Sequence, residues 1–460
     1  MKFDLSISQK EVIDFSLKSL YKNNSVYIDL ETGFGKTLTA VYLLKQMIGT
    51  DNRKVLYICP SGLIKQVEPV FKEHYKNLDI EFKPFSFFDD LKFLKTQLDT
   101  AKKYDIVIID EAHKIKNYSK SIMNQSERPL DYFIELYEKT SKLKKNIFPY
   151  TLVSIGVFEY IKRIPYSVFM SGSSMPLGAI DIFNFLWFIK HKLITNKHSR
   201  QESFFDFVNT YCIKKVSPLG VSYTGFKKST YDLLIKNISD FYKRWDHKDE
   251  KSDHLRIPEP EHIKIIVPDS KNEFQEEKRI IEILQKNYNV TPENFLEILK
   301  MTPQFNQLMV MRRAVGLAKV NYIFKNRKKF GEKVLFFFKF KESAQAFFNK
   351  MQKKHENVFL VNGELNHKKT LDIIQHANRL EKSFLIATMG KAGTGFDINN
   401  FPVSVFGELD LDQLQVIQAI GRILRKGIKF KPKLFYFLMD TGIDEMILKN
   451  LQSKNFKKLG

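Results

Sequence analysis

Short apolar runs alternate along the chain with longer segments in which apolar residues recur at helical spacing. In the first half, the runs that we predict to be buried β-strands cover residues 26–30, 55–59, 106–109 and 167–170. In the second half, they cover residues 334–338, 358–361, 384–388, 403–406 and 434–438. Strands separated by helices favour parallel sheets with crossover helices, so the pattern predicts an α/β fold with two doubly wound parallel-sheet lobes.

The pattern changes between the two groups of strands. Residues 191–310 are predicted to be helical and charged, without a convincing sheet pattern, and residues 246–253 are almost entirely charged or polar. We therefore expect a first lobe at 1–190, a helical protrusion with an inter-lobe linker at 191–310, and a second lobe at 311–460. A chain of 460 residues, 43% of them hydrophobic, is long enough for two or three domains.

A glycine-containing turn follows the first predicted strand and precedes a helical segment. It reads Glu31-Thr32-Gly33-Phe34-Gly35-Lys36-Thr37. Backbone N–H groups in such a turn can surround a phosphate at the start of a helix, so the turn is predicted to bind a nucleotide. Lys36 adds a positive charge and Thr37 a magnesium ligand. Leu30 occupies the position where the strict phosphate-loop pattern has glycine.

Acidic residues follow the third predicted strand, in the run Asp110-Glu111-Ala112-His113. At the tip of a buried strand, Asp110 can hold Mg²⁺ through its water shell, and Glu111 can orient and deprotonate the attacking water. Alone, the first motif is also compatible with an ordinary strand-to-helix turn, and the second with a solvated helix start. Together, each after an apolar run, they predict a nucleotide triphosphatase that uses ATP and Mg²⁺.

The net charge of +22, from 74 basic and 52 acidic residues, favours a polyanionic partner. The alternative is codon bias, because an AT-rich genome encodes chains rich in Lys, Phe, Ile and Asn. Most of the 41 phenylalanines lie in apolar runs, and a stacking platform for bases would interleave them with basic residues.

The cysteine content and the apolar runs bear on the compartment. Cys59 and Cys212 are too few for a disulfide framework or a zinc site, which fits a reducing environment. No uninterrupted apolar run reaches the roughly 18 residues of a membrane span, and the first residues lack a secretory signal. We expect an intracellular, cytoplasmic protein that is neither secreted nor membrane-bound, in a bacterial, phage-infected or viral context.

Two clusters in the second half are hard to explain as packing. The first is Thr388-Met389-Gly390-Lys391-Ala392-Gly393-Thr394-Gly395-Phe396-Asp397, where glycines after a strand permit close approach to a ligand. The second is Gln418-Ala419-Ile420-Gly421-Arg422-Ile423-Leu424-Arg425. Its spacing puts Arg422 and Arg425 on one helix face, from which two guanidinium groups can reach a γ-phosphate. A solvated basic face is the alternative.

The order of these motifs resembles that of the superfamily 2 helicases and translocases over nearly the whole chain. Gln9 corresponds to the adenine-reading glutamine of that family. The other correspondences are residues 33–37 with motif I, Cys59-Pro60-Ser61 with motif Ia, 110–113 with motif II, Ser171-Gly172-Ser173-Ser174 with motif III, 388–397 with motif V, and 418–425 with motif VI. The resemblance implies two RecA-like lobes, and it adds Gly395, Asp397 and Gln418 to the nucleotide-binding residues and Arg422 and Arg425 to the catalytic ones.

Within that superfamily the chain is most similar to the Swi/Snf-type translocases of double-stranded DNA. The residues that carry this similarity are the DEAH-type run continued as Lys114-Ile115-Lys116-Asn117, Pro176, Met311-Arg312-Arg313 and Ala318-Lys319. Motif III is one residue longer than usual. Motif VI continues as Lys426-Gly427, which resembles the branch-migration helicases of phages and poxviruses.

The resemblance implies an ATP-dependent DNA helicase or translocase that moves along or remodels duplex or branched DNA, holds it mainly by its phosphates, and works as a monomeric motor. An RNA helicase has the same motor, and the sequence does not separate the two substrates. A catalytically idle scaffold that binds nucleic acid is a third reading, against which the presence of Lys36, Glu111 and Arg425 argues.

Overall fold

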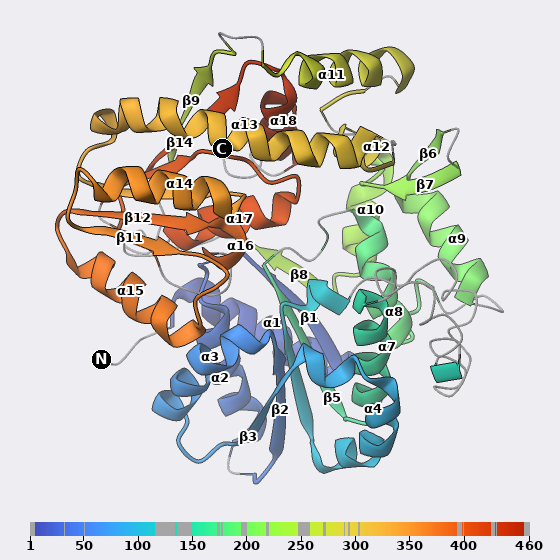
Figure 1. Ribbon diagram of the computed structural model, residues 1–460. Coiled ribbons are helices and arrows are strands. Elements are labelled where there is room, and N and C mark those ends of the chain that lie inside the picture. The colour runs from blue at the N-terminus through green and yellow to red at the C-terminus, as the bar shows by residue number, and fades with distance from the viewer. Residues whose placement is uncertain are drawn as a thin grey trace. The chain divides into compact units, whose positions relative to one another are not determined.

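The computed structural model describes residues 5–31, 33–49, 51–115, 134–135, 149–172, 175, 178–194, 200–217, 220–246, 258–269, 273–288, 290–292, 295–301, 304–392, 398, 400–424, 428 and 430–454. The chain divides into two compact units, Met1–Asp253 and His254–Gly460 (Figure 1).

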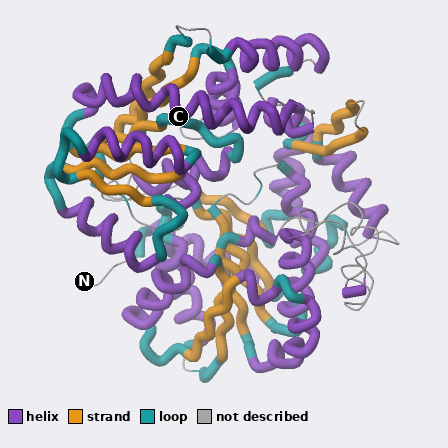
Figure 2. The backbone as a smooth tube through the Cα atoms, in the orientation of Figure 1, coloured by secondary structure: helices purple, strands orange, loops and turns teal. Residues whose placement is uncertain are grey.

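The first unit is built on a six-stranded parallel sheet with the order β3-β2-β4-β5-β1-β8 (Figure 2). Its strands are β1 Ser25–Leu30, β2 Lys54–Cys59, β3 Asp79–Pro84, β4 Ile106–Asp110, β5 Tyr166–Ser171 and β8 Tyr242–Trp245. Its helices are α1 Ile7–Asn23, α2 Lys36–Ile48, α3 Ser61–His74, α4 Leu91–Gln97, α7 Pro149–Ile161, α8 Phe183–Phe188, α9 Arg200–Tyr211 and α10 Tyr231–Asn237. Short 3₁₀ turns are η1 Phe85–Phe88, η2 Leu98–Lys103, η3 Ala112–Ile115, η4 Ala179–Ile182 and η5 Lys228–Thr230.

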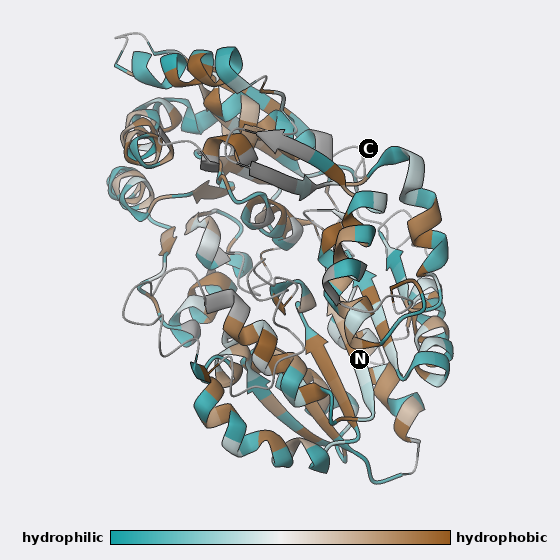
Figure 3. Cartoon of the chain, turned by 90° about the vertical axis from the view of Figure 1, so that its right-hand side faces the viewer, coloured by the Kyte–Doolittle hydropathy of each residue, from teal (hydrophilic) through white to brown (hydrophobic). Residues whose placement is uncertain are grey.

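Successive side chains of each central strand enter opposite cores, as the period of two along a strand requires. On β1, Val26, Ile28 and Leu30 pack with α1, α2 and α3, whereas Tyr27 packs on the other face with α7 and α8. Burial on both faces explains why the central strands are continuous apolar runs. Figure 3 shows brown stretches in strands of this sheet and both brown and teal residues in the helices.

The second unit is built on a six-stranded parallel sheet with the order β11-β12-β10-β13-β14-β9. Its strands are β9 Glu261–Val267, β10 Lys333–Phe338, β11 Val358–Val361, β12 Ser383–Thr388, β13 Val403–Phe406 and β14 Lys433–Met439. Its helices are α11 Gln275–Tyr288, α12 Phe295–Met301, α13 Gln304–Asn326, α14 Lys341–Gln352, α15 His367–Arg379, α16 Met389–Ala392, α17 Gln413–Ile423 and α18 Ile443–Lys454, with the 3₁₀ turn η8 Arg327–Phe330. Cores on both sheet faces complete a doubly wound lobe.

The predicted fold class of two doubly wound parallel-sheet lobes is confirmed, and every predicted strand is present. The expectation of no sheet in residues 191–310 is wrong. This segment contains β8, β9 and an antiparallel hairpin of β6 Ile213–Ser217 and β7 Gly220–Thr224. The strands β3, β8 and β9 are edge strands, and polar residues interrupt the apolar run in each of them. The three-part division of the chain stays a prediction.

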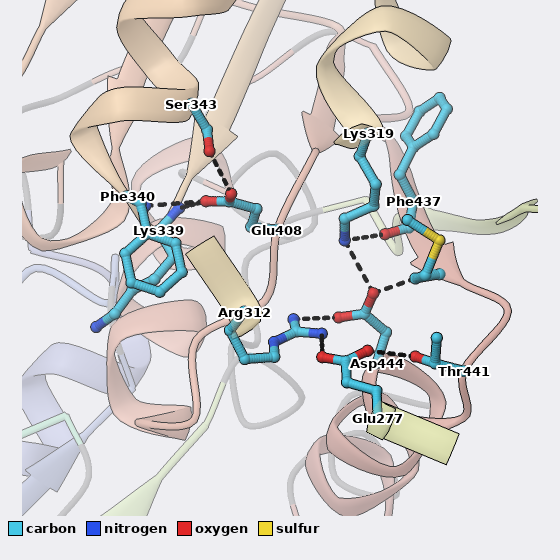
Figure 4. Close-up of polar contacts among 11 residues, drawn as sticks. Glu277, Arg312, Lys319, Lys339, Phe340, Ser343, Glu408, Phe437, Thr441 and Asp444 are labelled. Atoms are coloured by element: carbon cyan, nitrogen blue, oxygen red, sulfur yellow. Dashed lines mark hydrogen bonds and ion pairs between the residues drawn. The ribbon is translucent and has the colours of Figure 1, made fainter. Parts of the chain in front are cut away.

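Four charged side chains form a buried network in the second unit (Figure 4). Asp444, at the start of α18, pairs with Arg312 and with Lys319, whose Nζ lies 2.8 Å from Asp444 Oδ2. Arg312 Nη1 also lies 3.4 Å from Glu277 Oε1 on α11. Burial alone would raise the pKa of Asp444, but the charges of Arg312 and Lys319 hold it well below its usual range. The network therefore joins α11, α13 and α18 through compensated charges.

A second buried carboxylate, Glu408, holds the start of α14 in the same unit (Figure 4). It accepts hydrogen bonds from Lys339 N at 2.7 Å, Phe340 N at 2.9 Å and Ser343 Oγ at 2.6 Å. Gly316 of α13 lies against it, since a Cβ added there would fall 1.5 Å from Glu408 Oε1. The lack of a side chain at Gly316 thus lets α13 approach the carboxylate.

Replacing Asp444 with Asn should lower the free energy of unfolding by about 3 to 5 kcal/mol, because it leaves Arg312 and Lys319 buried without full compensation. The measurement is urea unfolding of the full chain. The pKa of Asp444 is lower in the folded chain than in the unfolded chain, where it is about 4. The contribution of Asp444 to the free energy of unfolding is therefore complete above about pH 4 and is lost as the pH falls further. The exposed Asp372→Asn is the matched control, and equal midpoints for both variants at pH 7 would contradict the assignment.

Candidate nucleotide-binding site

The candidate site of the first unit lies at the carboxyl edge of its sheet. β5 lies between β1 and β4 and runs parallel to both, so the segments that follow these three strands leave the sheet at the same edge. The glycine-containing turn follows β1, the Asp110–His113 run begins at the last residue of β4, and Ser171 is the last residue of β5. In open parallel sheets, the carboxyl edge is where ligands bind.

The turn after β1 has the backbone conformation that its glycines permit. Gly33 has a φ of 92° and Gly35 a φ of 95°, and α2 begins directly afterwards at Lys36. Phe34 is fully buried and donates its backbone N–H to Glu31 O at 3.0 Å. Lys36 and Thr37 are half-buried in the first turn of α2, where N–H groups lack partners within the helix. Thr32 lies outside the described residues.

Gln9 lies against this turn, and both the oxygen and the nitrogen of its side-chain amide form hydrogen bonds. Its Oε1 accepts from Ser6 N at 2.9 Å, and Ser6 Oγ accepts from Gln9 N at 3.1 Å, which makes a capping box at the start of α1. Its Nε2 donates to Phe34 O at 3.3 Å. The structure thus brings Gln9 to the loop, and its adenine-reading role stays a prediction.

The basic and acidic motifs meet across the sheet edge. Lys36 Nζ lies 3.5 Å from Glu111 Oε1, with both side chains largely shielded from solvent. Glu111 has a φ of 58°, an uncommon value for a residue with a side chain. Such conformations persist where the surrounding structure holds them, and they concentrate at functional sites. The backbone conformation therefore supports Glu111 as a functional residue.

Asp110 is buried, with 3% of its surface exposed. Its Oδ1 accepts from Glu111 N at 2.9 Å, and its Oδ2 accepts from Tyr57 OH at 3.1 Å. Burial, reinforced by the charge of Glu111, raises the pKa of Asp110 to about 6. An acid with a raised pKa beside a cationic loop is typical of a functional site.

His113 connects the acidic run to the end of β5. Its Nδ1 lies 3.2 Å from Glu111 Oε2 and 2.9 Å from Ser171 Oγ, and the ring is buried. Ser171 is the first residue of the sequence-predicted motif III. Sequence spacing could not reveal this contact, because it depends on β5 lying next to β4.

The residues present fit a nucleotide with magnesium. A positive-φ turn at a helix start offers N–H groups to phosphates, and Lys36 adds a charge. Within the described ranges, no group of three His, Cys, Asp or Glu side chains is arranged to hold a metal ion by itself. Mg²⁺ commonly binds through one or two carboxylates, substrate phosphates and water, so Asp110 and Thr37 suit it.

The second-unit candidates are placed in part. Gln418 and Arg422 lie on α17, both half-buried, and Thr388 ends β12. Gly395, Asp397 and Arg425 lie outside the described residues. No helix in the described part of the chain has the length and apolar character needed to cross a membrane.

Models of two protein families each match part of one unit. The model of the type III restriction enzyme res subunit matches residues 2–137, and the model of the helicase conserved C-terminal domain matches residues 317–427. The first match contains motifs I and II, and the second contains motifs V and VI, in the order of the superfamily. Together, the two matches support a superfamily 2 helicase.

Individual relatives agree with this superfamily 2 assignment. An uncharacterized ATP-dependent helicase, YqhH of Bacillus subtilis, is 31% identical over 125 residues, which is 25% of this chain and 21% of that protein. The chain thus spans about a fifth of that relative's length. The transcript termination protein A18 of Yaba-like disease virus is 19% identical over 98% of this chain and 78% of its own.

Among solved structures, this chain is similar to the Sulfolobus solfataricus SWI2/SNF2 ATPase core in complex with dsDNA. The identity is 15%, the TM-score is 0.41, and the match covers 100% of this chain and 97% of the other. Because this score is below 0.5, the fold assignment rests on the topology of the two sheets.

Replacing Gly35 with Ala should weaken nucleotide binding roughly tenfold or more, because strained backbone of this kind costs about 1 to 3 kcal/mol. The added Cβ would also lie 2.5 Å from Gln9 Nε2. Binding of a fluorescent nucleotide measures the effect. Gly49→Ala is the control, since Gly49 also has a positive φ, of 56°, but no atom within 4 Å of an added Cβ. Equal affinities for the two variants would count against the strained loop.

Replacing Asp110 with Asn should stabilise the nucleotide-free chain at pH 8. The folded pKa of about 6 lies above the unfolded value of about 4, so ionised Asp110 costs up to roughly 3 kcal/mol above pH 6. This cost disappears as the pH falls from 6 to 4, so the variant's advantage should shrink at pH 5. Urea unfolding at both pH values tests it, and an advantage that does not depend on pH would refute the raised pKa.

Proposed function

We propose that this chain couples ATP hydrolysis to movement along DNA. The observation that carries the proposal is the meeting of Lys36, Glu111 and Asp110 at the edge of a parallel sheet, beside a loop suited to phosphates. The family assignment supports an ATP-dependent nucleic-acid motor, and duplex or branched DNA is the finer part of the proposal.

In the proposed reaction, each group of the first unit has one task. Lys36 and the N–H groups at the start of α2 would bind the β- and γ-phosphates. Thr37 and Asp110 would hold Mg²⁺, which neutralises phosphate charge when bound. Glu111 would orient the attacking water and accept its proton, and His113, within 3.2 Å of Glu111 Oε2, would position that carboxylate.

The second unit would complete the reaction and link it to movement. Arg422 and Arg425 are proposed to stabilise charge on the γ-phosphate, with Gln418, Gly395 and Asp397 contacting the nucleotide. Closure of the two lobes around ATP would then depend on bound nucleic acid, and each cycle would become a step along the backbone. The net charge of +22 favours contacts to phosphates, which carry little sequence preference.

Steady-state ATP hydrolysis without nucleic acid, and with single-stranded DNA, duplex DNA, forked DNA or RNA, tests this function. Duplex or forked DNA should stimulate turnover most, and stimulation should fall between low and moderate salt as phosphate contacts are lost. Glu111→Gln provides the blank, since it keeps the side chain but cannot take the proton. Stimulation by RNA alone would replace the DNA proposal with an RNA helicase. No turnover above the blank would leave a nucleic-acid-binding scaffold.

A further inference from the structure

A tyrosine outside the superfamily 2 motifs lies beneath the acidic tip of β4. Tyr57, in the neighbouring strand β2, is fully buried, and its hydroxyl donates to Asp110 Oδ2 at 3.1 Å. Most residues of β2 are apolar, which suits a strand with both faces covered. A polar group in such a strand needs a partner, and Asp110 is the partner of this hydroxyl.

The ring of Tyr57 is fixed by its aromatic neighbours. Phe71 of α3 lies 5.3 Å from it between ring centroids, and Phe82 of β3 lies 5.5 Å from it. These two rings also contact each other at 5.9 Å, so the three form one cluster. Close packing of this kind leaves few alternative rotamers, and the hydroxyl is therefore presented to Asp110 from a set position.

The carboxylate of Asp110 is consequently held from two directions. Glu111 N donates to its Oδ1 at 2.9 Å, while Tyr57 donates to its Oδ2. Two hydrogen bonds to opposite oxygens fix the plane of a carboxylate, and with it the direction of the lone pairs that remain. Outer partners of this kind orient metal ligands and tune their affinity.

We propose that Tyr57 is a positioning residue for magnesium, which aims the Asp110 carboxylate at the ion beside the nucleotide phosphates. This inference rests on the proposed function, because it takes Asp110 as the magnesium ligand. Tyr57 would act on the ion only through Asp110, to which its hydroxyl donates.

Tyr57→Phe removes the hydroxyl and keeps the ring between Phe71 and Phe82. The experiment titrates Mg²⁺ into the full chain with fluorescent ADP and follows nucleotide binding without turnover. The variant should need about tenfold more Mg²⁺ for half-maximal binding, the usual size of an outer-partner effect. Binding in EDTA should stay unchanged, because Asp110 acts on the nucleotide through the ion. In hydrolysis assays, high Mg²⁺ should restore most of the lost kcat.

Tyr160→Phe is the matched control. Tyr160 is also a fully buried tyrosine of the first unit, and its hydroxyl pairs with Thr100 Oγ1 at 2.8 Å, away from the acidic run. It should leave the Mg²⁺ titration unchanged. Thermal unfolding without ligand checks that both variants fold.

The outcomes separate this inference from the function on which it rests. An unchanged Mg²⁺ requirement in Tyr57→Phe would overturn the positioning role and leave the proposed function intact. If Tyr57→Phe lost nucleotide binding equally in EDTA and in Mg²⁺, the effect would be structural, and the positioning role would be overturned as well. If the unmodified chain binds nucleotide with Mg²⁺ but hydrolyses none, the proposed motor fails while the role of Tyr57 is still decided. If it binds no nucleotide, both fail.

Discussion

All strands of the first sheet run in one direction, and the candidate site depends on that constraint. Because β1, β5 and β4 are neighbours and parallel, their carboxyl ends lie at one edge, where Lys36 contacts Glu111 and His113 contacts Ser171. Both faces of these strands are covered by helices, which excludes polar side chains from most positions along them. The candidate functional side chains accordingly lie at the edge, where N–H groups at helix starts are also available to an anion.

Two buried aspartates, one in each unit, have opposite electrostatic surroundings and opposite pKa shifts. Asp444 lies between Arg312 and Lys319, so its charge is compensated and its pKa is depressed. Burial, reinforced by the charge of the neighbouring Glu111, raises the pKa of Asp110 to about 6. The first arrangement stabilises the fold, whereas the second destabilises it at neutral pH. A buried charge that destabilises the fold is typical of a functional site. The surroundings of Asp110 therefore support a functional role independently of its motif.

The sequence was sufficient for the central strands, because a continuous apolar run is a local pattern. It also pointed to motifs I and II, which the structure brings into contact through Lys36 and Glu111, and the roles of these residues stay predictions. It was insufficient for the edge strands β3, β8 and β9, whose polar residues conceal their pairing. It was also insufficient for contacts between strands. His113 with Ser171 and Tyr57 with Asp110 each join residues more than fifty positions apart, and their meeting depends on sheet order, which spacing does not encode. Arg312 and Lys319 stood out in the sequence, but their partner Asp444 did not.

The strand that precedes the glycine-containing turn is itself held by residues late in the first unit. β8 pairs with β1 along its length, and Trp245 O accepts from Glu31 N at 3.1 Å, directly before the turn. Asp29 of β1, which is buried, accepts from Tyr242 OH at 3.0 Å and lies 3.5 Å from Arg244. The turn between Glu31 and Lys36 thus begins from a position set by residues more than two hundred positions later. Residues 242–245 therefore help to set the position of the proposed phosphate-binding turn, although they lie in a segment whose sequence predicts no sheet.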